Sequence, residues 1–318
     1  MTSSSSSSSS LDAASAPRSR TALVLGGGGS TGNAWLIGVI AGLVDAGLDV
    51  TTADLTVGTS AGSTAAAQLA GGSPTELYAA ILSAPVPQSA GSGRPGPGRA
   101  PASPTTDHLE WLHRIIAAST DAADLRRRLG AAALERAAAD DPAGSWRDKW
   151  RATVATRLPA TAWPERPVFI TAVDAETGDP VVFDRHSGVD LVDAVAASCS
   201  SGLPYRIGDH LYLDGGYRSN AENADLASGS DRVLVLSPFG GRSLTPVKWG
   251  THLATQVDEL RASGSVVETV FPESASEHLF GPNAMDVSQR PAAARAGHAQ
   301  GLALAKHLGE FWRRSERD

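Results

Sequence analysis

Residues 55–63 constrain the fold more than any other stretch, because a short apolar run leads through the turn Gly58-Thr59-Ser60-Ala61-Gly62 into an Ala-rich helix at residues 63–70. In a strand-to-helix turn of this kind, the central serine lies on a strained backbone with its hydroxyl exposed, and its neighbours must be small so that strand and helix can approach. Gly58 and Gly62 meet that need. The unpaired N–H groups that begin the helix stabilise negative charge at the hydroxyl. Ser60 is therefore a candidate nucleophile.

A second glycine-rich turn lies just upstream. Residues 21–25 form a short apolar run typical of a buried parallel strand, and it leads into Gly26-Gly27-Gly28-Gly29-Ser30-Thr31-Gly32. Apolar residues at helical spacing predict a helix over residues 33–46, and residues 55–57 form the next strand. In such a strand–helix–strand unit, both turns emerge at the carboxyl ends of parallel strands, where open α/β sheets place their sites. The glycine loop would then present bare N–H groups beside Ser60 as an oxyanion hole.

The same loop also satisfies the dinucleotide-binding pattern Gly27-x-Gly29-x-x-Gly32, with Asp49 or Asp54 as the acidic residue that would contact a ribose. We favour the oxyanion loop, because the next strand ends in the serine turn, which a dinucleotide site does not need. A nucleotide-binding module stays open as an alternative.

The 318 residues predict one α/β domain over residues 21–318. It follows a Ser-rich tail, residues 1–20, which we expect to be disordered, and it contains a flexible Pro/Gly-rich insertion at residues 84–106. Apolar periodicity predicts the remaining elements. The expected helices are residues 107–139, 146–156, 190–198, 251–260 and the C-terminal helix 289–314, and the expected strands are residues 168–173, 181–184, 211–213 and 232–237, the last of which is the final strand.

The strand at residues 211–213 leads directly into Asp214-Gly215-Gly216. An aspartate that ends a strand and precedes two glycines is expected to be exposed to solvent, because few side chains surround it. It is a candidate acid–base residue, although an aspartate before glycine is also common in ordinary turns.

Composition narrows the function further. The net charge of −7, without a stripe of Lys and Arg, argues against a nucleic-acid partner. The single Cys199 fits a reducing compartment, and the chain has no Cys/His spacing typical of a zinc site, so we expect a cytoplasmic protein without metal or cofactor. The longest apolar segment, residues 34–44, is too short to span a bilayer.

The glycine loop, the serine turn and the Asp214 turn, in this order, resemble the patatin-like phospholipase family over most of residues 21–238. The resemblance implies a three-layer α/β/α fold with a mainly parallel central sheet. It also implies a lipid or acyl-ester substrate and transient contact with a membrane surface. By position, Ser60 would be the nucleophile and Asp214 the base of a dyad without histidine. The other site residues implied are the oxyanion loop Gly27, Gly28, Gly29 and Gly32 with Ala61, the turn glycines Gly58 and Gly62, and Gly215 and Gly216 after the aspartate.

Two positions depart from the family pattern. Thr31 stands where members often carry Arg or Lys, so a charged contact at the oxyanion loop is expected to be missing. Gly202 stands where a proline is usual, and Pro204 follows, which predicts a different loop beside the dyad.

The sequence therefore predicts a serine acyl-ester hydrolase that works through an acyl-enzyme. A Ser-Asp-His esterase that uses His252 or His278 is a second enzyme reading, since the chain order Ser60, Asp214, His is the usual one. Against it, no strands precede residue 21 to supply the first part of such a fold. A lipid-binding protein that has lost catalysis is a further alternative, which the intact Ser60 and Asp214 disfavour.

Overall fold

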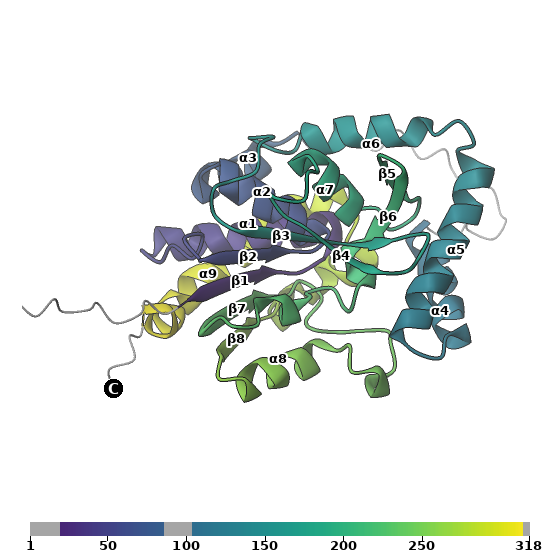
Figure 1. Cartoon of the computed structure of the whole chain (residues 1–318). Helices are drawn as coiled ribbons and strands as arrows, with labels where there is room; N and C mark the ends of the chain where they lie inside the picture. The colour runs from purple at the N-terminus through teal and green to yellow at the C-terminus, as the bar shows by residue number, and fades with distance from the viewer. Residues whose placement is uncertain (1–19, 86–103, 314–318) are drawn as a thin grey trace, which may run out of the picture.

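The computed structural model describes residues 20–85 and 104–313, which form a mixed α/β fold around one sheet (Figure 1). Within these residues the sheet has eight strands, in the order β5-β6-β3-β2-β1-β7-β8, with β4 paired to β3. Neighbours from β3 to β8 along this order are parallel, whereas β4, β5 and β6 join antiparallel. The strands are β1 (Thr21–Leu25), β2 (Leu55–Gly58), β3 (Val168–Asp174), β4 (Pro180–Phe183), β5 (Tyr205–Ile207), β6 (His210–Asp214), β7 (Arg232–Leu236) and β8 (Val266–Val270).

Helices cover both faces of the sheet, as predicted for three α/β/α layers (Figure 1). The β1 strand shows why: Leu23 and Leu25 join the core under α1, α2, α7 and α9, while Ala22 and Val24 join the core under α8. Alternate side chains thus point to opposite faces, and both faces are apolar because both are covered. The helices are α1 (Gly29–Asp45), α2 (Ala61–Gly71), α3 (Pro74–Ser83), α4 (Pro104–Ala118), α5 (Ala122–Asp140), α6 (Ser145–Ala155), α7 (Leu191–Ser198), α8 (Leu253–Ala262) and α9 (Arg290–Arg313).

The pairing of β3 brings the ends of the strands β2 and β6 together at one place in the sheet, which we call the junction on β3. The β4 strand occupies one edge of β3 over Ile170–Val173, so β2 and β6 must share the other edge. On that edge Gly58, the last residue of β2, pairs with Ile170, and Asp214, the last residue of β6, pairs with Ala172. Two strands that run in opposite directions therefore end almost head to head.

Several predicted elements need correction. The helix expected over residues 33–46 begins at Gly29, because the second half of the glycine loop is its first turn. The helix expected over residues 107–139 is two helices, and Asp121 separates them by accepting a hydrogen bond from the Asp124 N–H at the start of α5. The prediction that residues 232–237 form the last strand is wrong: β8 follows as an edge strand.

The predicted tail, residues 1–20, lies outside the described residues except for Arg20. Most of the predicted insertion, residues 84–106, also lies outside them, and its last residues begin α4. The α9 helix agrees with the predicted C-terminal helix to within a residue at each end. No helix in the described ranges is both long and apolar enough to cross a bilayer.

Candidate active site

Ser60 lies at the turn between β2 and α2 with a φ of 52° and a ψ of −115°. A positive φ is strained for a residue with a side chain, and such strain in native structures concentrates at functional sites. The turn requires glycine on both sides. A Cβ at Gly58 would lie 2.7 Å from the Ser63 Cα, and a Cβ at Gly62 would collide with the Leu25 carbonyl oxygen. The predicted turn is therefore present, with its glycines at the positions where strand and helix are closest.

Neighbouring side chains hold the Ser60 backbone. Its N–H donates to the Ser198 Oγ at 2.9 Å, and its carbonyl oxygen accepts from the Ser63 Oγ at 2.6 Å and from the Cys199 Sγ at 3.1 Å. Burial, and then the charge of Asp214, raise the pKa of the Cys199 thiol to about 11, so this cysteine stays protonated. Cys199 thus supports the turn as a donor.

The Ser60 Oγ donates a hydrogen bond of 2.9 Å to the Asp214 Oδ2. The other carboxylate oxygen, Oδ1, accepts from the Gly216 N–H at 2.8 Å, which fixes the carboxylate plane. The expectation that Asp214 is exposed to solvent is wrong, because this residue is only 7% exposed. Ser60 follows the end of β2, and Asp214 is the last residue of β6. Because these two strands meet at the junction on β3, the two side chains come into contact.

Burial raises the pKa of Asp214 to about 6, and the hydrogen bonds from the Gly216 N–H and the Ser60 hydroxyl lower it in part. A carboxyl group with that pKa is ionised at neutral pH and is a stronger base than an exposed aspartate. It can accept the proton of a serine hydroxyl that attacks an ester.

We expect kcat/KM for ester hydrolysis to rise about tenfold per pH unit below pH 6 and to level off above it, because only the ionised Asp214 accepts a proton. Initial rates between pH 4.5 and pH 8, with circular dichroism at each pH as a control for folding, measure this. A flat profile across pH 6 in a folded protein would contradict a base with this pKa.

The glycine loop lies against the nucleophile, since a Cβ at Gly27 would be 3.6 Å from the Ser60 Cβ. Two of the glycine N–H groups predicted for the oxyanion hole are already used: Gly27 donates to the Ala221 carbonyl at 2.7 Å, and Gly32 donates to the Gly28 carbonyl at 2.9 Å. Gly27 and Gly32 therefore shape the loop and do not supply oxyanion donors. Among the described hydrogen bonds, none takes the N–H of Gly28, Gly29 or Ala61.

A cation does lie on this loop, contrary to the expectation drawn from Thr31. Arg290, at the start of α9, donates from Nη1 to the Ser30 carbonyl at 2.8 Å and from Nη2 to the Asn33 Oδ1 at 3.1 Å. Thr31 is buried, and its N–H donates to the Ala284 carbonyl at 3.0 Å. The charge thus comes from a helix distant in sequence, which no local motif could indicate.

The histidines of the triad reading lie elsewhere. The His252 Nε2 is 2.7 Å from the Thr245 carbonyl oxygen, and His278 is exposed. Within residues 20–85 and 104–313, neither makes a hydrogen bond to Ser60 or Asp214.

The acidic residues of the dinucleotide reading have structural roles. Asp54 accepts from the Thr21 N–H at 2.8 Å, and it precedes β2, at the opposite end of the strands from the glycine loop. Asp49 accepts from Thr51 in a local turn. Neither carboxylate is placed to contact a ribose at the glycine loop. The described residues contain no cluster of three or more His, Cys, Asp or Glu side chains that could hold a metal ion.

The family model described as patatin-like phospholipase matches residues 23–225, and the chain belongs to this family. It is accordingly a lipid acyl hydrolase, as predicted. The match covers the glycine loop, the serine turn and the Asp214 turn together. A comparison with curated proteins finds no match.

Three solved structures resemble the fold. VipD from Legionella pneumophila has a TM-score of 0.41 and 12% identity over 94% of this chain and 69% of its own. ExoU from the type III secretion system of Pseudomonas aeruginosa, in complex with SpcU, has a TM-score of 0.39 and 18% identity over 93% of this chain and 53% of its own. A second structure of the type III effector ExoU has a TM-score of 0.37 and 21% identity over 94% of this chain and 54% of its own. The chain thus spans about half the length of ExoU, and likenesses this weak indicate nothing about substrate.

Proposed function

We propose that the protein hydrolyses acyl esters of lipids or lipid-like molecules, with Ser60 as nucleophile and Asp214 as the only acid–base group. The observation that carries the proposal is the 2.9 Å hydrogen bond from the Ser60 Oγ to the buried Asp214 Oδ2. A nucleophile within hydrogen-bond reach of an oriented base is the arrangement that covalent catalysis needs. The raised pKa of Asp214, about 6, suits a group that must take up and return a proton near neutral pH.

In the first step, the Ser60 Oγ attacks the ester carbonyl carbon while its proton passes to the Asp214 Oδ2. The tetrahedral oxyanion accepts hydrogen bonds from the N–H groups of Gly28, Gly29 and Ala61, which we propose as the oxyanion hole. The positive end of the α1 and α2 helix dipoles adds to this stabilisation. The bond between carbonyl carbon and alcohol oxygen then breaks, the alcohol leaves with the proton from Asp214, and the acyl group stays on Ser60.

In the second step, a water molecule attacks the acyl-enzyme and gives its proton to Asp214. The second tetrahedral intermediate uses the same three N–H groups. Its collapse breaks the bond to the Ser60 Oγ, which recovers a proton from Asp214, and the fatty acid is released. One carboxylate therefore serves both steps, and no histidine is required.

The proposal also covers the domain organisation and the cellular location of the protein. We place residues 21–318 in one catalytic domain, with residues 84–106 as a Pro/Gly-rich insertion, and we place the protein in the cytoplasm, in keeping with its single Cys199. Contact with a membrane surface would be transient, at the moment of substrate uptake.

A fluorophosphonate probe should form a covalent adduct at Ser60, because the probe captures an activated serine. Mass spectrometry of a tryptic digest locates the adduct, and release of p-nitrophenol from medium-chain esters measures turnover. We expect Ser60→Ala to lose both, by at least about 10³-fold for turnover. The control is Ser263→Ala, in an exposed turn after α8. Wild-type turnover in Ser60→Ala, or an adduct on another residue, would contradict the proposal.

Calorimetric titration with NAD tests the nucleotide-binding alternative. We expect no heat of binding, because Asp49 and Asp54, the acidic residues that could contact a ribose, accept hydrogen bonds from other residues of this chain. Binding of one NAD per chain would favour the alternative.

A further inference from the structure

We propose that Asn223 is a positioning residue that fixes the Ser60 hydroxyl relative to the Asp214 carboxylate. The inference rests on the proposed function and extends it to a residue outside the three motifs. Asn223 is fully buried and precedes the short 3₁₀ helix Ala224–Ala227. Apart from Ser60, it is the only non-glycine residue with a positive φ among the described residues, at 55°. Two strained positions at one site suggest a common constraint.

The side-chain amide of Asn223 reaches the neighbours of both dyad residues. Its Nδ2 donates to the Thr59 Oγ1 at 3.0 Å, and Thr59 immediately precedes Ser60. The same nitrogen donates to the Gly215 carbonyl at 2.9 Å, and Gly215 immediately follows Asp214. The Asn220 carbonyl also accepts from this nitrogen, at 3.1 Å, so the two N–H groups of the amide are shared among three acceptors. The bonds to Thr59 and Gly215 join the serine turn to the aspartate turn.

The contact falls at the junction on β3. Thr171 lies between Ile170 and Ala172, the residues that pair with Gly58 and Asp214. Its Oγ1 donates to the Thr59 Oγ1 at 3.0 Å, and a Cβ at Gly215 would collide with it. At this junction no ladder hydrogen bond runs from β2 to β6, since both pair with β3. Side chains must therefore set their separation, and Asn223 donates a hydrogen bond to each of the two turns.

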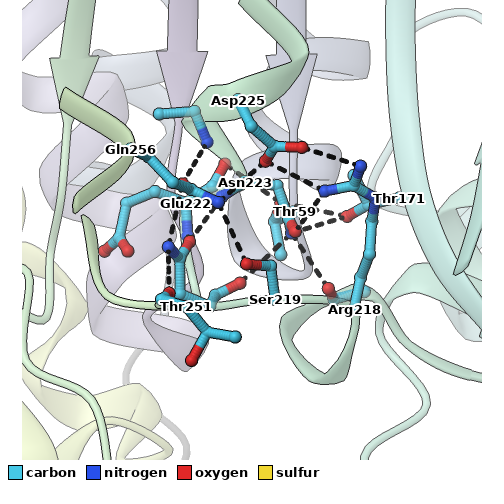
Figure 2. A network of polar contacts seen from close by, with 12 residues as sticks. Thr59, Thr171, Arg218, Ser219, Glu222, Asn223, Asp225, Thr251 and Gln256 are labelled. Atoms are coloured by element: carbon cyan, nitrogen blue, oxygen red, sulfur yellow. Dashed lines mark hydrogen bonds and ion pairs between the residues drawn. The ribbon is translucent and has the colours of Figure 1, made fainter. Parts of the chain in front are cut away.

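A partly buried ion pair fixes which way the amide points. Arg218 donates from Nη1 to the Asn223 Oδ1 at 3.1 Å, and it forms a two-point contact with Asp225 at 3.0 and 2.8 Å (Figure 2). Gln256 adds a donor to the Asp225 Oδ1 at 2.8 Å. A flipped amide would put its N–H groups against the Arg218 guanidinium and its oxygen against the carbonyl oxygens of Gly215 and Asn220, three unfavourable contacts. The orientation with Nδ2 toward the dyad is thus the stable one.

The test compares three substitutions at residue 223. Asn223→Gly keeps a backbone that tolerates positive φ and removes the amide, so the protein should stay folded. Asn223→Asp keeps the shape and the contact with Arg218, but it replaces the donors with an oxygen and adds a buried carboxylate. Asn223→Ala loses the amide and adds backbone strain. Asn283→Gly is the matched control, because Asn283 is exposed and bonds only to nearby carbonyls.

We expect Asn223→Gly and Asn223→Asp to lower kcat by at least about tenfold with KM within twofold, and to slow fluorophosphonate labelling by a similar factor. The pH profile is the decisive reading. In Asn223→Gly, which adds no charge, a looser Ser60 hydroxyl lowers the pKa of Asp214 less, so the pKa near 6 in the rate profile should move upward. A merely structural role would lower the melting temperature and leave that pKa in place.

An unchanged kcat and an unchanged pKa in either folded variant would overturn the inference, and should Asn223→Gly not fold, Asn223→Asp decides. Ser60→Ala, measured in parallel, distinguishes a failure of the positioning role from a failure of the proposed function. An inactive Ser60→Ala beside an unimpaired Asn223→Asp rejects the positioning role alone, whereas an active Ser60→Ala rejects the proposed function.

Discussion

Asp214→Asn is expected to lower kcat for ester hydrolysis by about 10³-fold, within the range attributed to a positioned general base. The asparagine keeps the shape of the side chain and can still accept from the Gly216 N–H. It cannot take the Ser60 proton, because an amide is not basic near neutral pH. Stopped assays with a medium-chain p-nitrophenyl ester measure the loss. A variant that retained more than a tenth of wild-type kcat would show that another group accepts the proton.

The same substitution should stabilise the fold at neutral pH. An aspartate whose pKa is about 6 when folded and 3.8 when unfolded binds its proton more tightly in the folded state. The folded state therefore loses stability as the pH rises from about 4 to about 6, and above that range the full cost, about 3 kcal/mol, is present. Asparagine carries no charge and avoids this cost.

Thermal unfolding at two pH values separates the effects. We expect Asp214→Asn to raise the melting temperature at pH 8 and to change it little at pH 4, where the wild-type carboxyl is already protonated in the folded state. The exposed Asp209→Asn, in the turn between β5 and β6, is the control and should change neither value. Equal melting temperatures for wild type and Asp214→Asn at both pH values would show that burial of this charge costs nothing.

The dyad could be predicted from the sequence because each of its residues lies in a local signal. Ser60 is flanked by the two glycines that its turn requires, and Asp214 ends a strand before two more. What these signals lack is the distance between the two residues. That distance depends on β2 and β6 sharing one edge of β3, a long-range pairing that the apolar pattern of each strand alone does not specify.

Some residues at the site could not be predicted from the sequence, because their hydrogen-bond partners lie far away in the chain. Arg290 contacts Ser30 from the start of α9, and Asn223 contacts Thr59 across the junction. Glu222 is 1% exposed, and its Oε2 has no hydrogen-bond partner in the described part of the chain. Burial raises its pKa to about 7. No spacing rule along the sequence marks such positions.

The strands β5 and β8 were not predicted for a simpler reason. The β5 strand has only three residues, too few for a periodic pattern. The β8 strand, Val266–Val270, pairs with β7 alone, and a glutamate interrupts its apolar run. Edge strands need less apolar surface than central ones, so hydropathy predicts them poorly.

The helices α1 and α9 were both predicted, but their mutual packing was not, and it leads to the second large effect. Gly38 and Gly42 on α1 face Gly297 and Gly301 on α9. A Cβ at Gly38 would collide with the Ala294 carbonyl oxygen, and one at Gly42 with that of His298. Gly297 and Gly301 each meet an α1 carbonyl in the same way. The two backbones are thus in direct contact, which only residues without a side chain permit.

We expect Gly38→Ala to lower the free energy of unfolding by about 3 kcal/mol, the upper part of the range for overpacking a core. In an isolated helix the same change would be favourable by about 1 kcal/mol, so the sign tests the packing. Urea unfolding followed by circular dichroism measures it, with Gly202→Ala as control, since nothing lies within 4 Å of a Cβ there. Because α9 also brings Arg290 to Ser30, a displaced α9 should lower activity too. A Gly38→Ala variant as stable as wild type would show that the two helices can move apart without cost.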